Sequence, residues 1–163
     1  MWYKIARNNL SISYRPIKKD DYVGLYRIYS NKNVVNDTNW QDMDVTTDLM
    51  KEFVDECLCH PTRKTYSVLN DGKVIGVVFL HNLEKFPGWA EVGCMLNENF
   101  WNKGIMSNVV SDIIDKSKFD KFYSITSKTN EGSKKLFKKI GFNEDPQFLD
   151  SDNNISFSYI KTS

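Results

Sequence analysis

The chain has 163 residues, and its 22 Lys and Arg against 21 Asp and Glu give a formal net charge of +1. This length fits one domain that can bury a core, so we expect a single domain over residues 1–163. A balanced charge creates no general field that would attract nucleic acid, and no stretch forms an obvious basic stripe. Nucleic acid is therefore not an expected partner.

Cysteine usage and apolar runs indicate the compartment. Cys57, Cys59 and Cys94 are odd in number and lack zinc-type spacing, which favours reduced thiols and no metal site. The first residues show no long apolar segment with a small-residue cleavage site, and no run of about 18 apolar residues occurs. We expect a cytoplasmic protein without a membrane partner; whether it forms a homodimer stays open.

The first part of the chain predicts one strand and two helices. Asp20 and Asp21 precede an apolar periodicity of helical spacing and are expected to cap that helix. Pro16 ends the strand and Pro61 lies beyond the second helix. The expected elements are a strand over 11–15, a helix over 22–29, a polar loop over 31–44 around Trp40, and a helix over 49–57.

Three strands are expected next. Thr65–Leu69 and Val74–Leu80 flank Asn70-Asp71-Gly72-Lys73, and an Asp-Gly pair tolerates the positive φ angles of a tight hairpin. Trp89–Leu96 forms the third run, after the turn at residues 86–88. These three strands should be antiparallel neighbours.

The remaining elements complete an α/β class with a mixed, mostly antiparallel sheet and helices on both faces. The strand at Trp89–Leu96, the following helix and the strand at Phe122–Thr126 form a crossover that should make these strands parallel. The last elements are a helix over Asn130–Ile140 stopped by Gly141, and a hairpin strand with Ile155, Phe157 and Tyr159 alternating after a turn at 150–154.

The segment NFWNKGIMSNVV, from Asn99 to Val110, leaves a strand and opens a helix. Ligands of open α/β sheets bind beyond the carboxyl ends of strands. The unpaired N–H groups of a helix's first turn attract phosphate oxygens, and Gly104 lets a ligand approach the backbone closely. A glycine alone is also common in ordinary turns, so the surrounding sequence decides the interpretation.

Three motifs give that context. Trp101-Asn102-Lys103-Gly104-Ile105-Met106 resembles the Gln/Arg-x-x-Gly-x-Gly/Ala signature of the GNAT superfamily of acetyl-CoA-dependent N-acetyltransferases. Its FW-x-KGI form is most similar to the branch that acetylates the N-terminal amines of ribosomal proteins. TNEGSKKLFKKIGF, from Thr129 to Phe142, is similar to the family's Asn-x-x-Ser/Ala…Gly-Phe helix, and WAEVGCML to its glutamate-bearing strand. The element order agrees over almost the whole chain.

The resemblance implies acetyl-CoA as cosubstrate and a primary amine, either a small molecule or a protein N-terminus, as acceptor. Main-chain N–H groups of the loop would bind the diphosphate, strand backbone would pair with the pantetheine arm, and Asn130 would bind the cofactor's amide region. Met106 departs from the family's Gly or Ala, and Phe137 from a tyrosine that many members use. The implied cofactor-binding residues are Cys94, Met95, Leu96, Asn102, Lys103, Gly104, Ile105, Met106, Ser107, Asn130 and Ser133.

Acetyl transfer needs a neutral amine, a polarised carbonyl and a proton for the departing thiolate. Glu91 stands in an otherwise apolar strand and is the candidate general base, because partial burial raises a carboxyl pKa; a salt-bridged strand carboxylate is the alternative. Ser133, one helical turn after Asn130, is the candidate proton donor, with Tyr123 and Tyr159 in reserve.

The acceptor is expected under the loop at residues 31–44, with Trp40 as an apolar or cation–π wall and Asp37 attracting a cation. His81, at a strand exit, could flank the site. Two other functions are compatible with the same sequence. One is a catalytically inactive acyl-CoA-binding module, suggested by Met106 and Phe137, and the other is a protein-interaction domain without a cofactor.

Overall fold

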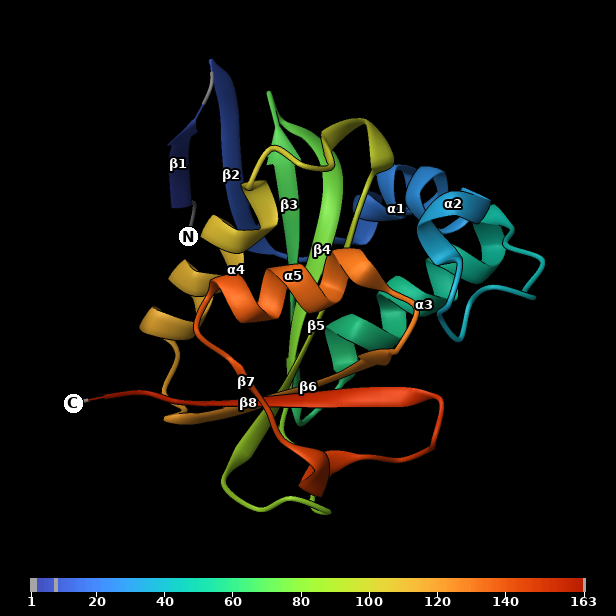
Figure 1. Ribbon diagram of the computed structural model, residues 1–163. Coiled ribbons are helices and arrows are strands. Elements are labelled where there is room, and N and C mark those ends of the chain that lie inside the picture. Colours follow the sequence, from blue (N-terminus) through green and yellow to red (C-terminus); the bar gives the residue numbers. More distant parts are fainter. Residues whose placement is uncertain (1–2, 8, 163) are drawn as a thin grey trace.

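The structure is a computed structural model that describes residues 3–7 and 9–162 (Figure 1). Its described strands form one sheet in the order β1-β2-β3-β4-β5-β6-β8-β7. The strands are β1 (Tyr3–Arg7), β2 (Leu10–Pro16), β3 (Arg63–Asn70), β4 (Lys73–His81), β5 (Trp89–Leu96), β6 (Lys121–Ser127), β7 (Asn143–Glu144) and β8 (Asn154–Ile160). The helices are α1 (Tyr22–Tyr29), α2 (Lys32–Val35), α3 (Thr47–Cys59), α4 (Ile105–Lys116) and α5 (Glu131–Lys139), with 3-10 turns η1 (Lys19–Asp21), η2 (Glu98–Phe100) and η3 (Pro146–Phe148).

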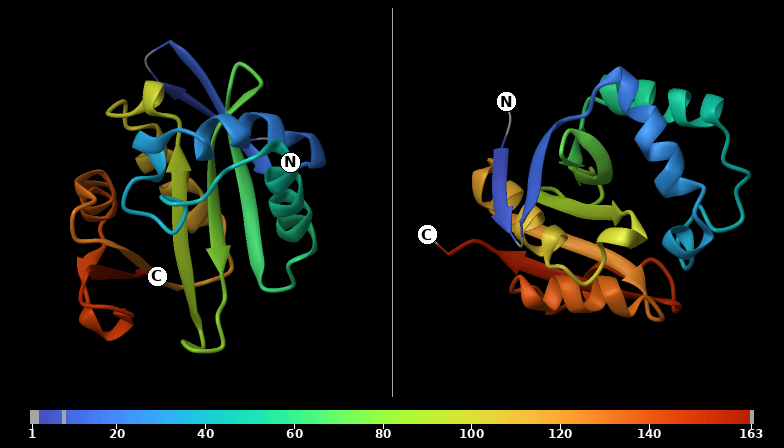
Figure 2. Two further views of the ribbon diagram at one scale, coloured as in Figure 1. Left: turned by 90° about the vertical axis from the view of Figure 1, so that its right-hand side faces the viewer. Right: turned by 90° about the horizontal axis from the view of Figure 1, so that it is seen from above.

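Helices cover both faces of the sheet, as the apolar periodicity predicts. The apolar sides of α4 and α5 pack on one face, and those of α1 and α3 pack on the other, each in its own core cluster. Figure 2 shows these two layers from above, with the sheet between them. The expected class, a mixed and mostly antiparallel α/β fold, is confirmed. None of the helices described here is long and apolar enough to cross a membrane.

The hairpin between β3 and β4 confirms the turn prediction. Asp71 and Gly72 have φ angles of 49° and 77°, the left-handed geometry that an Asp-Gly pair tolerates. The pairing of β2, β3, β4 and β5 is antiparallel throughout, and β5 and β6 are parallel as the crossover requires.

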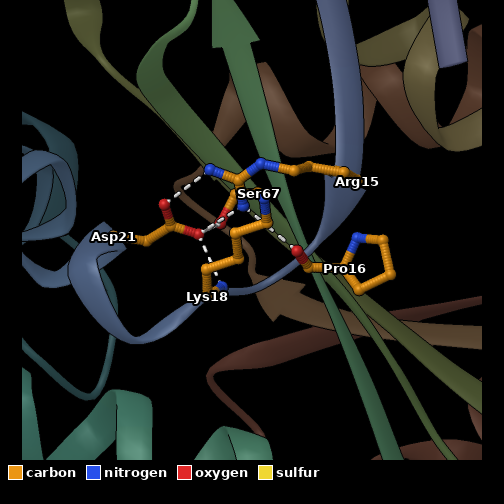
Figure 3. A network of polar contacts seen from close by, with 5 residues as sticks. All are labelled: Arg15, Pro16, Lys18, Asp21 and Ser67. Atoms are coloured by element: carbon orange, nitrogen blue, oxygen red, sulfur yellow. Dashed lines mark hydrogen bonds and ion pairs between the residues drawn. The ribbon is translucent and has the colours of Figure 1, made fainter. Parts of the chain in front are cut away.

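The expected capping role of Asp20 and Asp21 is wrong. Asp21 precedes α1 but makes no side-chain cap; its carboxylate instead accepts bonds from both terminal nitrogens of Arg15, at 2.7 and 2.8 Å, and from the Ser67 hydroxyl at 2.7 Å (Figure 3). It also accepts the main-chain N–H of Lys18 at 2.8 Å, which makes Asp21 part of a capping box at the start of η1 and not of α1. A buried charge needs such partners, and the ion pair with Arg15 ties β2 and β3 to the start of the helical segment.

Two further expectations need correction. The segment 31–44 is not all loop, because Lys32–Val35 forms α2, capped by the Asn31 side chain and anchored by buried Val34 and Val35. The last strand, β8, pairs mainly with β6, and its hairpin partner β7 is only two residues long. The sequence reading also missed β1, which pairs antiparallel with β2 at the sheet edge.

Candidate functional site

The central sheet opens between two neighbouring strands. β5 and β6 pair only at Trp89↔Lys121, Ala90↔Phe122 and Glu91↔Tyr123. Residues 92–96 of β5 pair with β4 but with nothing on the β6 side in the described chain. The main chain of residues 92–96 is therefore unpaired on that side, and an extended ligand can pair with it as an added strand would.

The predicted pantetheine-binding residues lie along this open edge. Cys94 and Leu96 point towards the α4–α5 face, where they pack against the core, while Met95 packs on the α1–α3 face. Their side chains are thus engaged in the core, and what they offer a ligand is backbone. Burial raises the pKa of the Cys94 thiol to about 12, so this group stays protonated and is a poor nucleophile.

The segment that begins at Asn99 leads from the open edge of β5 into α4. The indole N–H of Trp101 donates to the Leu96 carbonyl at 2.8 Å and folds the loop back over the strand end. Asn102 and Gly104 both adopt positive φ, 58° and 68°, and Gly104 occupies the N-cap of α4 without a side-chain cap. The N–H groups of the first turn of α4 thus begin a few residues beyond the unpaired end of β5.

The segment from residue 102 to 107 contains both exposed and buried side chains. Asn102 and Lys103 are exposed, whereas Ile105 and Met106 are 2% and 7% exposed and pack into the core under the sheet. Met106 therefore stands in regular helix with its side chain turned inward, where a larger residue than Gly or Ala is accommodated. Ser107 follows in the same first turn, and its side chain is half-buried.

The second expected motif begins α5. The side-chain oxygen of Asn130, Oδ1, caps the helix by accepting the Ser133 main-chain N–H at 3.1 Å. The side-chain N–H₂ of Asn130 is left as a donor for a ligand. Ser133 is half-buried. Phe137, which departs from the tyrosine that the resemblance implies, is 2% exposed and packs against Phe142 and Phe157 in the core.

Glu91 stands at the point where the strands separate. Side chains alternate along a strand, so Glu91 faces the same side as Met95, the α1–α3 side. Burial, with a smaller contribution from the charge of Asp150, raises the Glu91 pKa above its usual value. Tyr123, its partner across the strands, is 1% exposed; burial, assisted by the charge of Glu91, raises the tyrosine pKa.

An aromatic cluster buries Tyr123 at this end of the sheet. Tyr123 stacks on Phe148 with ring centroids 4.4 Å apart, and Trp89 and Phe86 pack edge-on against Phe148 at 4.9 Å. Phe148 and Asp150 come from the segment that joins β7 to β8. Sequence reasoning missed both, because nothing local marks a residue that meets Glu91 from some 60 positions away in the chain.

A cavity of about 490 Å³ opens on the α1–α3 face. Trp40 is one of its walls, in contact with Tyr29 and Phe53 at centroid distances of 4.5 and 5.3 Å. Phe79 lies on β4 beside Gly93, so close that a Cβ added to Gly93 would stand 2.0 Å from the ring. The residues that line the cavity are Tyr29, Asn39, Trp40, Met43, Leu49, Glu52, Phe53, Glu56, Cys57, Arg63, Thr65, Val77 and Phe79.

The other two predicted acceptor residues do not line this cavity. Asp37 has φ 61°, and its main-chain N–H donates to the Gln41 side chain, within the loop. His81 pairs with Glu91 across β4 and β5, but its ring packs edge-on against His60 at 4.8 Å. Burial and then the neighbouring His60 lower the His81 pKa, so the ring is neutral near neutral pH. In the described part of the chain, no three His, Cys, Asp or Glu side chains gather as a metal site requires.

Comparison with known families identifies the fold. Residues 12–143 match the acetyltransferase (GNAT) domain. The chain belongs to this family of acetyltransferases. The GNAT resemblance seen in the sequence is thereby confirmed, and the match includes β5, the quoted loop and α5. Comparison with curated protein sequences gives no significant match.

Solved GNAT structures share the architecture at low sequence identity. RimL, a ribosomal alpha-N-protein acetyltransferase in complex with coenzyme A, superposes with a TM-score of 0.78 at 16% identity, over 97% of this chain and 98% of that one. Spermidine N-acetyltransferase from Vibrio cholerae, with coenzyme A and spermine, gives 0.74 at 17%, over 91% and 95%. Ribosomal-protein-S5-alanine acetyltransferase from Vibrio fischeri gives 0.72 at 20%, over 98% and 96%.

Proposed function

We propose that this protein transfers an acetyl group from acetyl-CoA directly to a primary amine while both substrates are bound. The observation that carries the proposal is the separation of β5 from β6 immediately after Glu91, beside the loop that opens α4. This arrangement offers unpaired backbone to an extended thioester arm and first-turn N–H groups to its diphosphate. Coenzyme A or acetyl-CoA in the neighbouring structures supports the same assignment.

The cofactor-binding roles follow from what each residue presents. The loop from Asn102 to Ser107 contributes main-chain N–H groups to the diphosphate, with Lys103 adding positive charge at the exposed rim. The backbone of Cys94–Leu96 pairs with the pantetheine arm and polarises the thioester carbonyl. The Asn130 side-chain N–H₂ donates to the amide part of the arm.

The acceptor amine has to lose a proton before or during attack. Glu91 accepts that proton, directly or through a water, because its raised pKa places it closer to the operating pH than an ordinary carboxylate. The amine nitrogen forms a bond to the carbonyl carbon, the carbon–sulfur bond breaks, and the thiolate takes a proton from the Ser133 hydroxyl. The hydroxyl recovers it from solvent.

Direct transfer is favoured over a covalent enzyme intermediate. The Cys94 thiol, on the strand beside the open edge, is held protonated by burial and cannot act as an efficient nucleophile. Placement of the two substrates then supplies much of the rate enhancement. The acceptor enters from the α1–α3 face, where Trp40 and the cavity lie.

The decisive experiment is a coenzyme A release assay with acetyl-CoA and a panel of small amines and N-terminal peptides, accompanied by calorimetry with acetyl-CoA. Amine-dependent thiol release, with intersecting initial-velocity lines and no acetylated protein by mass spectrometry, supports direct transfer. Binding without release for any amine would instead indicate an acyl-CoA-binding module. No binding of acetyl-CoA at about millimolar concentration would indicate an interaction domain that uses no cofactor.

A further inference from the structure

The cavity on the α1–α3 face contains two buried polar groups with unused hydrogen-bonding capacity. In the described part of the chain the Arg63 Nε–H has no hydrogen-bond partner, and the Thr65 hydroxyl has no nitrogen or oxygen partner and interacts only with the Cys57 thiol, where it opposes the rise in the thiol pKa that burial causes. Thr65 is 7% exposed, and the Arg63 side chain is 16% exposed. Both residues line the cavity and, two apart on β3, they project from the same face of the sheet. A buried donor without an acceptor is costly, and a ligand can remove that cost.

The charge of Arg63 is already balanced. Its Nη2 makes an ion pair with Glu56 at 3.2 Å and a longer contact of 3.5 Å to the Cys57 sulfur. Glu52, also on the cavity wall, adds a further negative charge. The unmet need is thus a hydrogen-bond acceptor and not a counter-ion. A neutral carbonyl oxygen fits this end of the cavity better than a carboxylate, which Glu52 and Glu56 would repel.

The middle of the cavity is apolar. Tyr29, Trp40 and Phe53 pack against one another along one side, and Val77 and Phe79 project from β4. Apolar and aromatic walls favour burial of an apolar group by removing its surface from water.

The spacing of the strands sets the length of the ligand. Arg63 and Thr65 lie on β3, which is separated from β5 by β4. Adjacent strands lie about 4.8 Å apart, so the two polar atoms stand roughly 10 Å from the strand that carries Glu91. An acceptor that reaches both ends needs its amine and its carbonyl separated by about that distance.

We infer that this cavity is the specificity subsite for an elongated acceptor: a primary amine on an apolar or aromatic body whose far end carries a neutral carbonyl oxygen, bound by Arg63 and Thr65. The inference rests on the proposed acetyl transfer for the position of the amine. The subsite itself rests on the cavity, on the unpaired Arg63 Nε–H and on the Thr65 hydroxyl beside it.

The test compares three acceptors of one shape: para-(aminoethyl)benzamide, para-(aminoethyl)benzoate and para-methylphenethylamine. The benzamide is expected to have a KM about tenfold below that of the methyl compound, the size of one or two buried hydrogen bonds. The benzoate should be no better than the benzamide. Equal KM values for benzamide and methyl compound would overturn the subsite, and a clear preference for benzoate would overturn its neutral character.

Two variants locate the preference. Thr65→Val removes the hydroxyl without changing the shape, and Arg63→Lys keeps the charge near Glu56 while removing the Nε–H. Each should reduce several-fold the ratio between the KM of the methyl compound and that of the benzamide. Thr62→Val is the matched control, because Thr62 is an exposed residue beside β3 that does not line the cavity. Retention of the full preference in both cavity variants would contradict the assignment.

Calorimetry without acetyl-CoA separates this inference from the proposed function. If no amine of any kind is acetylated, the transferase proposal fails, while tighter binding of the benzamide than of the methyl compound, lost in Thr65→Val, would still support the subsite. If amines are acetylated but the three probes bind alike, the subsite fails and the transferase proposal stands.

Discussion

Glu91 and Tyr123 face each other at the last paired position of the two parallel strands β5 and β6. Burial is the main reason why the pKa of each is raised, and the charge of Glu91 raises that of Tyr123 further. The tyrosine therefore stays neutral, and the carboxylate is left as the group at the opening of the sheet that titrates closer to neutral pH.

Glu91→Gln should lower the turnover number most strongly above the Glu91 pKa, where the carboxylate is ionised. There the glutamate accepts the proton of the amine and glutamine cannot, whereas at lower pH the glutamate is protonated and the two proteins converge; loss of a general base costs on the order of a hundredfold. The measurement is kcat against pH, with the exposed loop variant Glu84→Gln as control. Superimposable profiles for Glu91→Gln and the unmodified protein would rule out this base.

Asp150→Asn should move the acidic limb of the same profile to lower pH. The negative charge of Asp150 adds to the effect of burial in raising the Glu91 pKa, so its removal lowers that pKa and leaves the base ionised at lower pH. Asparagine keeps an oxygen for the bond that Asp150 accepts from Asn154 at 2.7 Å. Asp152→Asn is the control, and a limb that stays in place or moves upward contradicts the electrostatic coupling.

Gly104→Glu should abolish acetyl-CoA binding, because a carboxylate would project beside the diphosphate from a backbone position that favours glycine. The strain of a positive φ is shared by Gly72, in the β3–β4 turn, where an added Cβ meets nothing within 4 Å. Gly72→Glu should therefore lower the melting temperature to a similar extent and leave the dissociation constant unchanged. Calorimetry and thermal denaturation of both variants separate strain from ligand conflict.

Ser133→Ala should lower kcat about a hundredfold without loss of stability. Asn130 caps α5 through the Ser133 main-chain N–H, so the substitution keeps the cap and removes only the hydroxyl. The pH dependence of kcat and the melting temperature are the two readings. If kcat is unchanged in Ser133→Ala and falls in Tyr159→Phe, the tyrosine held in reserve is the donor.

Asp21→Ala should destabilise the fold by about 3–5 kcal/mol, since it leaves the Arg15 charge buried without its partner carboxylate. Urea denaturation measures the change in the free energy of unfolding. Asp48→Ala is the comparison: its ion pair with Lys51 is exposed at both ends, and surface pairs contribute about 0–1 kcal/mol. Similar losses for the two variants would show that the buried pair does not stabilise the fold.

Periodicity and turn chemistry predicted most of the fold. The Asp71-Gly72 turn, the crossover from β5 to β6 and the α5 helix ended by Gly141 with φ 97° depend on local residues, and the structure has all three. Asp21 was placed wrongly because an aspartate before a helix ordinarily caps it, and only the tertiary arrangement brings Arg15 and Ser67 to it. Short β7 carries too few residues for a pattern.

The site could be predicted only where it is contiguous in sequence. Gly104 and its neighbours form one loop, and Asn130 and Ser133 form one helix start, so short motifs suffice to find them. The acceptor cavity has no such signature, because helices and strands far apart in the chain build it, and of the predicted acceptor residues only Trp40 lines it. The expected roles of the site residues stay predictions until the variants are measured.

The limited pairing between β5 and β6 also bears on how the chain folds. The β3–β4 and β4–β5 ladders join strands connected through residues 71–72 and 82–88, so they close short loops and can form early, whereas β2 and β3 pair residues 50 to 58 positions apart. The β5–β6 junction joins segments about 30 residues apart through three paired positions, and it depends on α4 having already packed. The seam that opens to admit a ligand is therefore expected to assemble after the β3–β4 and β4–β5 hairpins.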